Sequence, residues 1–213
     1  MSHHLRYAGA TPDLQERVLV EIIRGQPHLM AILEGMDALG LPDPLLGSGA
    51  IYNTVWNVLT SRPVLTGIND ADVVYFDDSD LSYEAEDRVI RSAEMHFRDL
   101  PIQVEVRNQA RVHLWFRQRF GMDYPRLTCS ADMMRYFATK THAVAARLES
   151  DGAMSIFAPF GLDDMFSFRV TPNPALANRE THERKAARAK AIWPELTVVP
   201  WPLDALDAGL DDH

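Results

Sequence analysis

The sequence predicts an α+β protein: a small mixed β-sheet flanked by helices, with helices before the sheet and a hairpin and a helix after it. One observation is the β-branched and aromatic run at residues 71–76, which favours a strand. Another is the alternation at residues 102–106, where the apolar side chains share one face. Between them lies a helical pattern that begins near Ser82 and has acidic residues in its first turn. This order predicts that the two strands are neighbours in one sheet.

We predict that residues 1–40 form a helical segment that packs against the rest of the chain. Thr11 or Asp13 can cap a first helix, and Pro12 suits its first turn. Gly25-Gln26-Pro27 separates this helix from a second one. Both helices carry apolar residues at helical spacing, which indicates packing rather than chemistry.

The remaining elements follow from local signals of the same kind. Asp151-Gly152 is a hairpin turn signal between two strands. The basic run near the C-terminus indicates a solvated helix face, or a helix that covers an anionic ligand. In chain order we predict a short strand at 45–46, a helix at 50–59, a loop at 61–69, strands at 142–148 and 154–158, a basic helix at 178–192 and a frayed tail at 203–213.

Composition indicates one domain, residues 1–213, in the ordinary globular range: 46% of the residues are hydrophobic and 24% are charged. No apolar run approaches the roughly 18 residues of a membrane span, and no apolar signal segment opens the chain. Cys129 is the single cysteine, which excludes an intramolecular disulfide and a multi-cysteine zinc site. We therefore predict a cytoplasmic protein. Its net charge of −9 is evidence against a broad nucleic-acid interface.

Two carboxylates, Asp70 and Asp72, lie at the head of the strand at 71–76. Residues two apart in a strand share a face, so both side chains point the same way. Two like charges held together are unfavourable unless something positive lies between them. The pair therefore favours a divalent cation such as Mg²⁺, which binds carboxylates and substrate phosphates. The alternative is that both acids only flank the turn that starts the strand.

Two further residues favour the cation site. Glu105 is an acid in mid-strand, which must be solvated or paired. Arg111 falls in the first turn of a helix capped by Asn108, where a cation costs roughly 0.3–1 kcal/mol and a bound anion would reverse that cost. The alternatives are a solvated Glu105 and an exposed Arg111 with a partner such as Asp77 or Glu105.

Gly47-Ser48-Gly49 forms a small-residue turn just before the helix at 50–59. Such a turn leaves backbone N–H groups free at a helix N-terminus, where phosphates bind. The alternative is that the turn is only a helix cap.

In chain order these motifs resemble the nucleotidyltransferase superfamily typified by DNA polymerase beta and the antibiotic-modifying nucleotidyltransferases. More closely, the stretch from about Leu46 to Trp201 resembles a family of bacterial proteins described only as nucleotidyltransferase-like. One departure is the 21 residues between Ser48 and Asp70, more than the superfamily usually has. The matching pieces are residues 49–51, 70–77, 104–115, 158–164, 172–174 and 192–194.

The resemblance implies transfer of a nucleoside monophosphate from a nucleoside triphosphate to an acceptor that the sequence does not identify. It implies that Asp70, Asp72 and Glu105 hold Mg²⁺ or Mn²⁺ and that the turn at 47–49 holds phosphate. A phosphate contact by Arg111 is our own inference from helix polarity. Two other functions stay open: a metal-dependent phosphohydrolase that uses the same acids, and a nucleotide-binding or interaction protein whose site has decayed.

Overall fold

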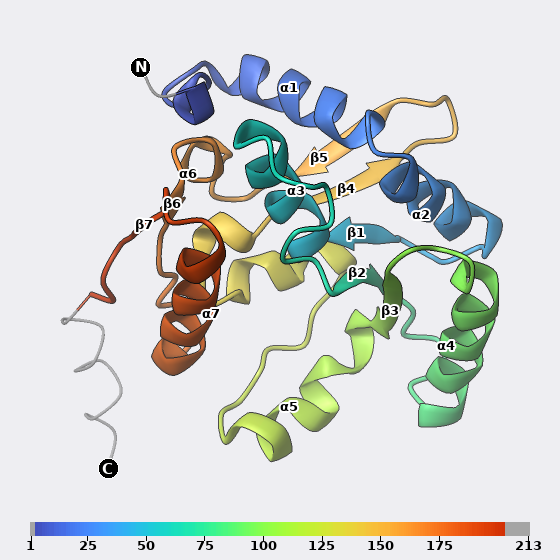
Figure 1. Ribbon diagram of the computed structural model, residues 1–213. Helices are drawn as coiled ribbons and strands as arrows, with labels where there is room; N and C mark the ends of the chain where they lie inside the picture. The colour runs from blue at the N-terminus through green and yellow to red at the C-terminus, as the bar shows by residue number, and fades with distance from the viewer. Residues whose placement is uncertain (1–2, 203–213) are drawn as a thin grey trace, which may run out of the picture.

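The computed structural model describes residues 3–202, so the predicted tail at 203–213 lies outside the described residues. A five-stranded mixed sheet, in the order β3-β2-β1-β4-β5, forms its centre (Figure 1). The pair β2–β3 is parallel, and the other neighbouring pairs are antiparallel. The predicted mixed sheet, with its two motif strands as neighbours, is confirmed. The strands are β1 (Leu45–Gly47), β2 (Asp70–Tyr75), β3 (Gln103–Asn108), β4 (Ala145–Leu148) and β5 (Met154–Phe157).

Helices lie around the sheet, and α3 contacts both β1 and β2 (Figure 1). A small parallel pair of strands, β6 (Arg169–Val170) and β7 (Thr197–Val198), joins segments near the C-terminus and has no counterpart in the sequence predictions. The α-helices are α1 (Pro12–Arg24), α2 (Pro27–Ala38), α3 (Gly49–Leu59), α4 (Tyr83–Phe97), α5 (Val112–Phe120), α6 (Asp163–Phe166) and α7 (Arg179–Ile192). Single turns of 3-10 helix lie at His3–Leu5, Gln109–Arg111 and Lys140–His142, and a longer one at Ser130–Tyr136.

Side-chain caps start two of the helices, and the first of them, Thr11, is one of the two predicted caps. The hydroxyl of Thr11 accepts a hydrogen bond from the Leu14 amide at the start of α1, and the hydroxyl of Ser82 accepts one from Ala85 at the start of α4. Asn108 differs from the prediction because its backbone stays in β3. Its side chain accepts from the Ala110 amide and begins a 3-10 turn that precedes α5.

Helix α3 runs through the main hydrophobic core and is buried on nearly all sides. Its Trp56 is fully buried, and the indole N–H donates to the Met165 carbonyl at 3.0 Å. The apolar residues of β2 and β3 that alternate with the acids face this core. The acids are therefore directed to the opposite face of the sheet, since successive strand residues alternate.

The long loop before β2 is held by α3 and by the residue that ends α7. The Asn57 side chain donates to the carbonyls of Val64 and Thr66 and accepts from the Trp193 indole. Gly67 has φ of +71°, and a methyl group there would lie 2.6 Å from the Trp193 ring. Only glycine suits both constraints. The loop therefore delivers the chain to Asp70 in a defined position.

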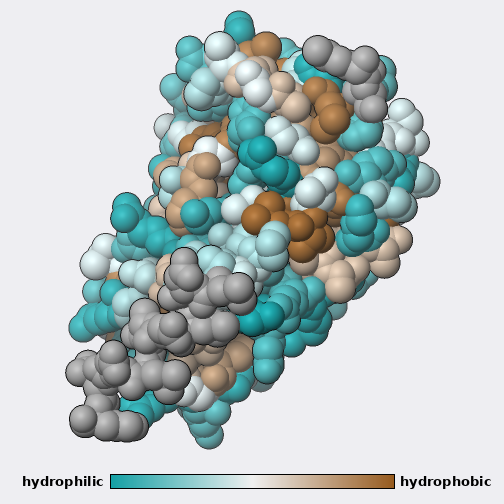
Figure 2. All heavy atoms as spheres, turned by 90° about the vertical axis from the view of Figure 1, so that its left-hand side faces the viewer, coloured by the Kyte–Doolittle hydropathy of each residue, from teal (hydrophilic) through white to brown (hydrophobic). Residues whose placement is uncertain are grey.

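No helix among residues 3–202 is both long and apolar enough to cross a membrane. Helix α7 presents much of its polar surface to solvent, and the face of the molecule that includes it is mostly hydrophilic (Figure 2).

Candidate active site

The three predicted carboxylates lie on two neighbouring strands. Asp72 is directly opposite Glu105 in the parallel pair β2–β3, and Asp70 is opposite Gln103. Paired residues of neighbouring strands point to the same face, and adjacent strands lie about 4.8 Å apart. The structure thus brings Asp70, Asp72 and Glu105 to one face of the sheet. Glu105 is also engaged by Arg107, whose guanidinium lies 3.3 Å from the carboxylate.

The turn at 47–49 lies beside these acids because β1 is the other neighbour of β2. Gly47 is paired with Asp72, and the chain then turns directly into α3. Ser48 has φ of 55° and ψ of −119°, a strained conformation for a residue with a side chain. Its amide donates to the Val144 carbonyl at 2.8 Å, which helps to hold the turn.

Helix α3 offers its first amides at this turn. Its intrahelical hydrogen bonds start with the amides of Ile51 and Tyr52, which both donate to the Ser48 carbonyl. The amides of Gly49 and Ala50 precede them and point out of the helix end. An anion is favoured at this position by the amides and by the helix dipole.

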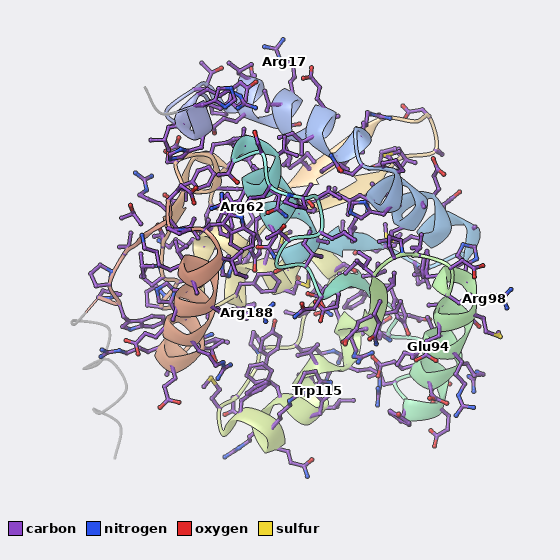
Figure 3. The ribbon with its side chains drawn as sticks, viewed as in Figure 1. Arg17, Arg62, Glu94, Arg98, Trp115 and Arg188 are labelled. Carbon is purple, nitrogen blue, oxygen red and sulfur yellow. The ribbon has the colours of Figure 1, made fainter. Side chains whose placement is uncertain are left out.

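A pocket of about 230 Å³, the central pocket, lies between this turn, the start of β2 and helix α7. Its acidic side consists of Asp70 and Asp72. Its basic side consists of Lys185 and Arg188, and Figure 3 shows Arg188 extending from α7 toward the sheet. The other lining residues are Ser48, Gly49, Tyr52, Asn53, Gly67, Ile68, Asn69, Ala189, Ile192 and Trp193.

The pocket changes the proton affinity of its charged groups. Burial, followed by the negative charges of Asp70 and Glu105, raises the pKa of Asp72 to about 6, against the opposing effects of Lys185 and Arg107. Asp72 keeps an exposed surface because it lines an open pocket, but the protein around its carboxylate replaces much of the water. Burial lowers the pKa of Lys185, and the charge of Asp72 opposes that shift. Both shifts have the same cause, which is charge that water does not fully stabilise.

The two cations of the pocket form no ion pairs within the described residues. In the described part of the chain, neither Lys185 nor Arg188 has a carboxylate within 4.0 Å. The pocket thus has acids on one side, two such cations on the other, and free amides at one end. A ligand that combines a phosphate chain with a divalent cation would satisfy all three.

Two of the three acids, Asp70 and Asp72, are placed to bind such a cation. Across residues 3–202, no three His, Cys, Asp or Glu side chains are close enough to form a metal cluster as they stand. Glu105 is the carboxylate engaged elsewhere, with Arg107. Asp70 and Asp72 alone suit Mg²⁺, which commonly takes one or two carboxylates together with phosphate oxygens.

Arg111 lies in a different environment from the one that the sequence predicts. It does not line the central pocket. It follows the C-terminal end of β3 and forms an ion pair with Glu86 of α4. Its Nε donates to the Leu81 carbonyl at 3.0 Å, and both charged side chains are largely buried. The partner is neither Asp77 nor Glu105, because the fold places α4 against this end of β3.

We therefore expect Arg111→Met to destabilise the fold and to leave the affinity for nucleotide unchanged. Removing one member of a buried ion pair costs about 3–5 kcal/mol, since it leaves the other charge buried and unpaired. Urea unfolding measures the stability, and calorimetry with a nucleoside triphosphate and Mg²⁺ measures the affinity. Glu86→Gln in the same chain should recover part of the stability. A tenfold weaker affinity with unchanged stability would instead support the phosphate contact predicted from helix polarity.

Sequence patterns did not indicate that Tyr52 and Asn53 line the pocket. They also did not show which basic residues face it. Tyr52 and Asn53 fall within a helix whose apolar spacing predicted only packing. Lys185 and Arg188 were part of the basic run, for which a cover over an anionic ligand was one of two interpretations. Their spacing of three residues places them on one helix face, but the partner of that face depends on the fold.

Comparisons with known proteins agree with this fold. Residues 34–198 match the model of a protein family described as Nucleotidyltransferase. The chain belongs to this nucleotidyltransferase family, which confirms the class that the sequence resemblance predicted. No curated protein matches the chain.

One similar solved structure is described with the words "The NMR structure of the protein reveals a CCA-adding enzyme head domain". It is 26% identical in sequence, with a TM-score of 0.69, and the match covers 86% of this chain and 95% of that one. The shared fold is therefore that of a nucleotidyltransferase head domain.

Proposed function

We propose that the protein is a Mg²⁺- or Mn²⁺-dependent nucleotidyltransferase, which moves a nucleoside monophosphate from a nucleoside triphosphate to an acceptor. The observation that carries the proposal is the central pocket, where Asp70 and Asp72 face Lys185 and Arg188 beside the free amides of α3. Membership of the nucleotidyltransferase family supports the class of reaction. The likeness to a CCA-adding enzyme head domain supports the same class and leaves the acceptor open.

In this proposal the residues of the pocket, and Glu105 on the neighbouring strand, each contribute to the reaction. Asp70 and Asp72 hold the divalent cation, with Glu105 joining them when it leaves Arg107. When bound, the cation supplies charge neutralisation for the phosphates and for the attacking and leaving oxygens. The amides of Gly49 and Ala50 bind phosphate oxygens, and the basic side of the pocket binds the rest of the phosphate chain.

The reaction is an in-line displacement. The acceptor oxygen forms a bond to the α-phosphorus while the bond from that phosphorus to the bridging oxygen breaks, and pyrophosphate leaves. Glu105 takes the proton from the acceptor. Catalysis by the chain then consists of positioning and of electrostatic stabilisation, which such reactions mainly require.

The test uses the purified protein with each α-labelled nucleoside triphosphate and Mg²⁺ or Mn²⁺. Size fractions of a boiled extract, total RNA and denatured protein are supplied in separate reactions as acceptors. We expect pyrophosphate release together with label on one acceptor fraction. Free labelled nucleoside monophosphate without any labelled acceptor would indicate the phosphohydrolase. Binding of nucleotide with neither product would indicate a decayed site.

A further inference from the structure

Tyr52 belongs to the part of α3 that borders the central pocket. Helical side chains lean toward the N-terminus, so a residue in the first turn reaches back to the start of its helix. A methyl group added at Gly49 would lie 3.9 Å from the Tyr52 hydroxyl oxygen. The phenol oxygen therefore lies near the start of α3. The Tyr52 hydroxyl and the Gly49 amide are thus hydrogen-bond donors at the same end of the pocket.

The Tyr52 ring is held in place by two neighbouring rings, those of His142 and Trp56. It stacks on the His142 ring with centroids 4.2 Å apart and planes 12° from parallel, and it contacts Trp56 with centroids 5.0 Å apart. Tyr52 is 9% exposed and His142 is 2% exposed. Packed rings have few alternative rotamers, so the hydroxyl end is fixed in one place at the pocket.

His142 supports the ring by packing rather than by charge. Burial, helped by the positive charges of Lys185 and His182, lowers the pKa of His142 well below its ordinary value. The imidazole is therefore neutral at physiological pH. Within residues 3–202 its Nε2 has no hydrogen-bond partner, so no polar contact of that atom accounts for its position beneath Tyr52.

The Tyr52 hydroxyl keeps its proton throughout the physiological range. Burial, then the nearby negative charge of Asp72, raises the pKa of Tyr52 further above its ordinary value. The charge of Arg188, and to a smaller extent the neighbouring Ser48 side chain, act in the opposite direction. A protonated phenol at this end of the pocket is a hydrogen-bond donor for an anion bound there.

We propose that Tyr52 is a catalytic residue of the nucleotidyl transfer and that His142 is its positioning residue. The phenol O–H donates a hydrogen bond to a non-bridging oxygen of the reacting phosphate, whose negative charge it stabilises as the bond to pyrophosphate breaks. The tyrosine proton stays on the tyrosine; the acceptor proton goes to Glu105 as above. This inference rests on the proposed function and adds a donor to it.

Tyr52→Phe is the direct test, because it removes the hydroxyl and keeps the stacked ring. Loss of one preorganised donor costs about 10²–10³ in rate, so we expect kcat to fall by about 10²-fold while the Kd for nucleotide changes little. Tyr75→Phe is the matched control: Tyr75 is also buried but lies at the other end of β2 from Asp70. This control should keep the wild-type kcat.

A sulfur substitution in the nucleotide separates a contact with the reacting phosphate from an indirect effect. Replacing each non-bridging α-oxygen by sulfur in turn weakens a hydrogen bond to that oxygen. We expect one of the two diastereomers to slow wild type by a larger factor than it slows Tyr52→Phe. Equal factors in the two proteins for both diastereomers would overturn the contact.

Two variants test the positioning role. His142→Phe keeps a flat ring beneath Tyr52 and should keep most of the wild-type kcat. His142→Ala removes the ring and should lower kcat toward that of Tyr52→Phe, with little change in nucleotide Kd. Melting curves identify any variant that is unfolded at the assay temperature. If both variants lose activity equally while folded, stacking is not the role of His142.

The outcomes also separate this inference from the proposed function. A wild-type protein that nucleotidylates no acceptor with any nucleotide overturns the proposed function, and the role of Tyr52 falls with it. A wild-type protein that transfers, together with a Tyr52→Phe variant of equal kcat, overturns only the role of Tyr52.

Discussion

Asp72→Asn is expected to abolish nucleotidyl transfer, with a rate at least about 10²-fold below wild type. Asparagine has nearly the same volume as aspartate, but it replaces a charged oxygen ligand by a neutral amide. The acidic side of the central pocket then has one charge to offer a divalent cation instead of two. Single-turnover transfer with each nucleoside triphosphate measures the effect. Asp99→Asn, a change of the same kind at an exposed surface position, should leave the rate unchanged.

The same variant is expected to be as stable as wild type without metal, or slightly more stable. Asp72 is close to Asp70 and Glu105, and removal of one of three like charges relieves repulsion. The sign of the pH dependence follows from the pKa of Asp72, which the folded protein raises to about 6 from the ordinary value of 3.8. The folded state thus binds the proton more tightly than the unfolded state between these values. Wild type therefore loses stability as pH rises from about 4 to 6, and the variant lacks that loss.

Melting curves at pH 4 and pH 7, each with and without Mg²⁺, test these expectations. At pH 7 Mg²⁺ should raise the Tm of wild type by mass action on the folded state and hardly change the Tm of Asp72→Asn. At pH 4 Asp72 is protonated, so Mg²⁺ should have little effect on either protein. If the variant melts lower than wild type without metal and responds to Mg²⁺ equally well, Asp72 is a structural residue at the start of β2.

The second large effect is expected from the basic side of the central pocket. Lys185→Met together with Arg188→Met should weaken nucleoside triphosphate binding by about 10²-fold, because each charge-assisted hydrogen bond is worth roughly 1.5–3 kcal/mol. Nucleoside monophosphate binding should weaken much less, since this ligand lacks the outer phosphates that these cations contact in the proposed complex. Calorimetry with both ligands, in the presence of Mg²⁺, measures the two affinities.

Arg184→Met is the matched control for this pair. It removes a cation from the same helix, next to Lys185, but from a position that does not line the pocket. We expect nucleoside triphosphate affinity to stay within about twofold of wild type, since exposed charges act only weakly through solvent. Equal losses in Arg184→Met and in the double variant would mean that α7 acts through its overall charge, and not through contacts made by Lys185 and Arg188.

The sequence by itself determined the strands at 71–76 and 102–106, the helix between them and the mixed sheet they share. These features depend on residue periodicity and on short connections, which are local properties of the chain. The resemblance to nucleotidyltransferases was likewise available from contiguous motifs, and the family match confirms it. Whether Asp70, Asp72 and Glu105 bind metal stays a prediction that the experiments above address.

The tertiary structure decided which cations meet these acids. Helix polarity placed Arg111 at an anion site, but α4 packs against that end of β3 and supplies Glu86 as its partner. Lys185 and Arg188 come from a helix more than a hundred residues beyond Asp70, and Trp193 at its end packs against Gly67 in the loop before β2. The physical reason is that a charged side chain finds its partner through space. The sequence shows which charges a helix carries, while only the packing of that helix shows what they face.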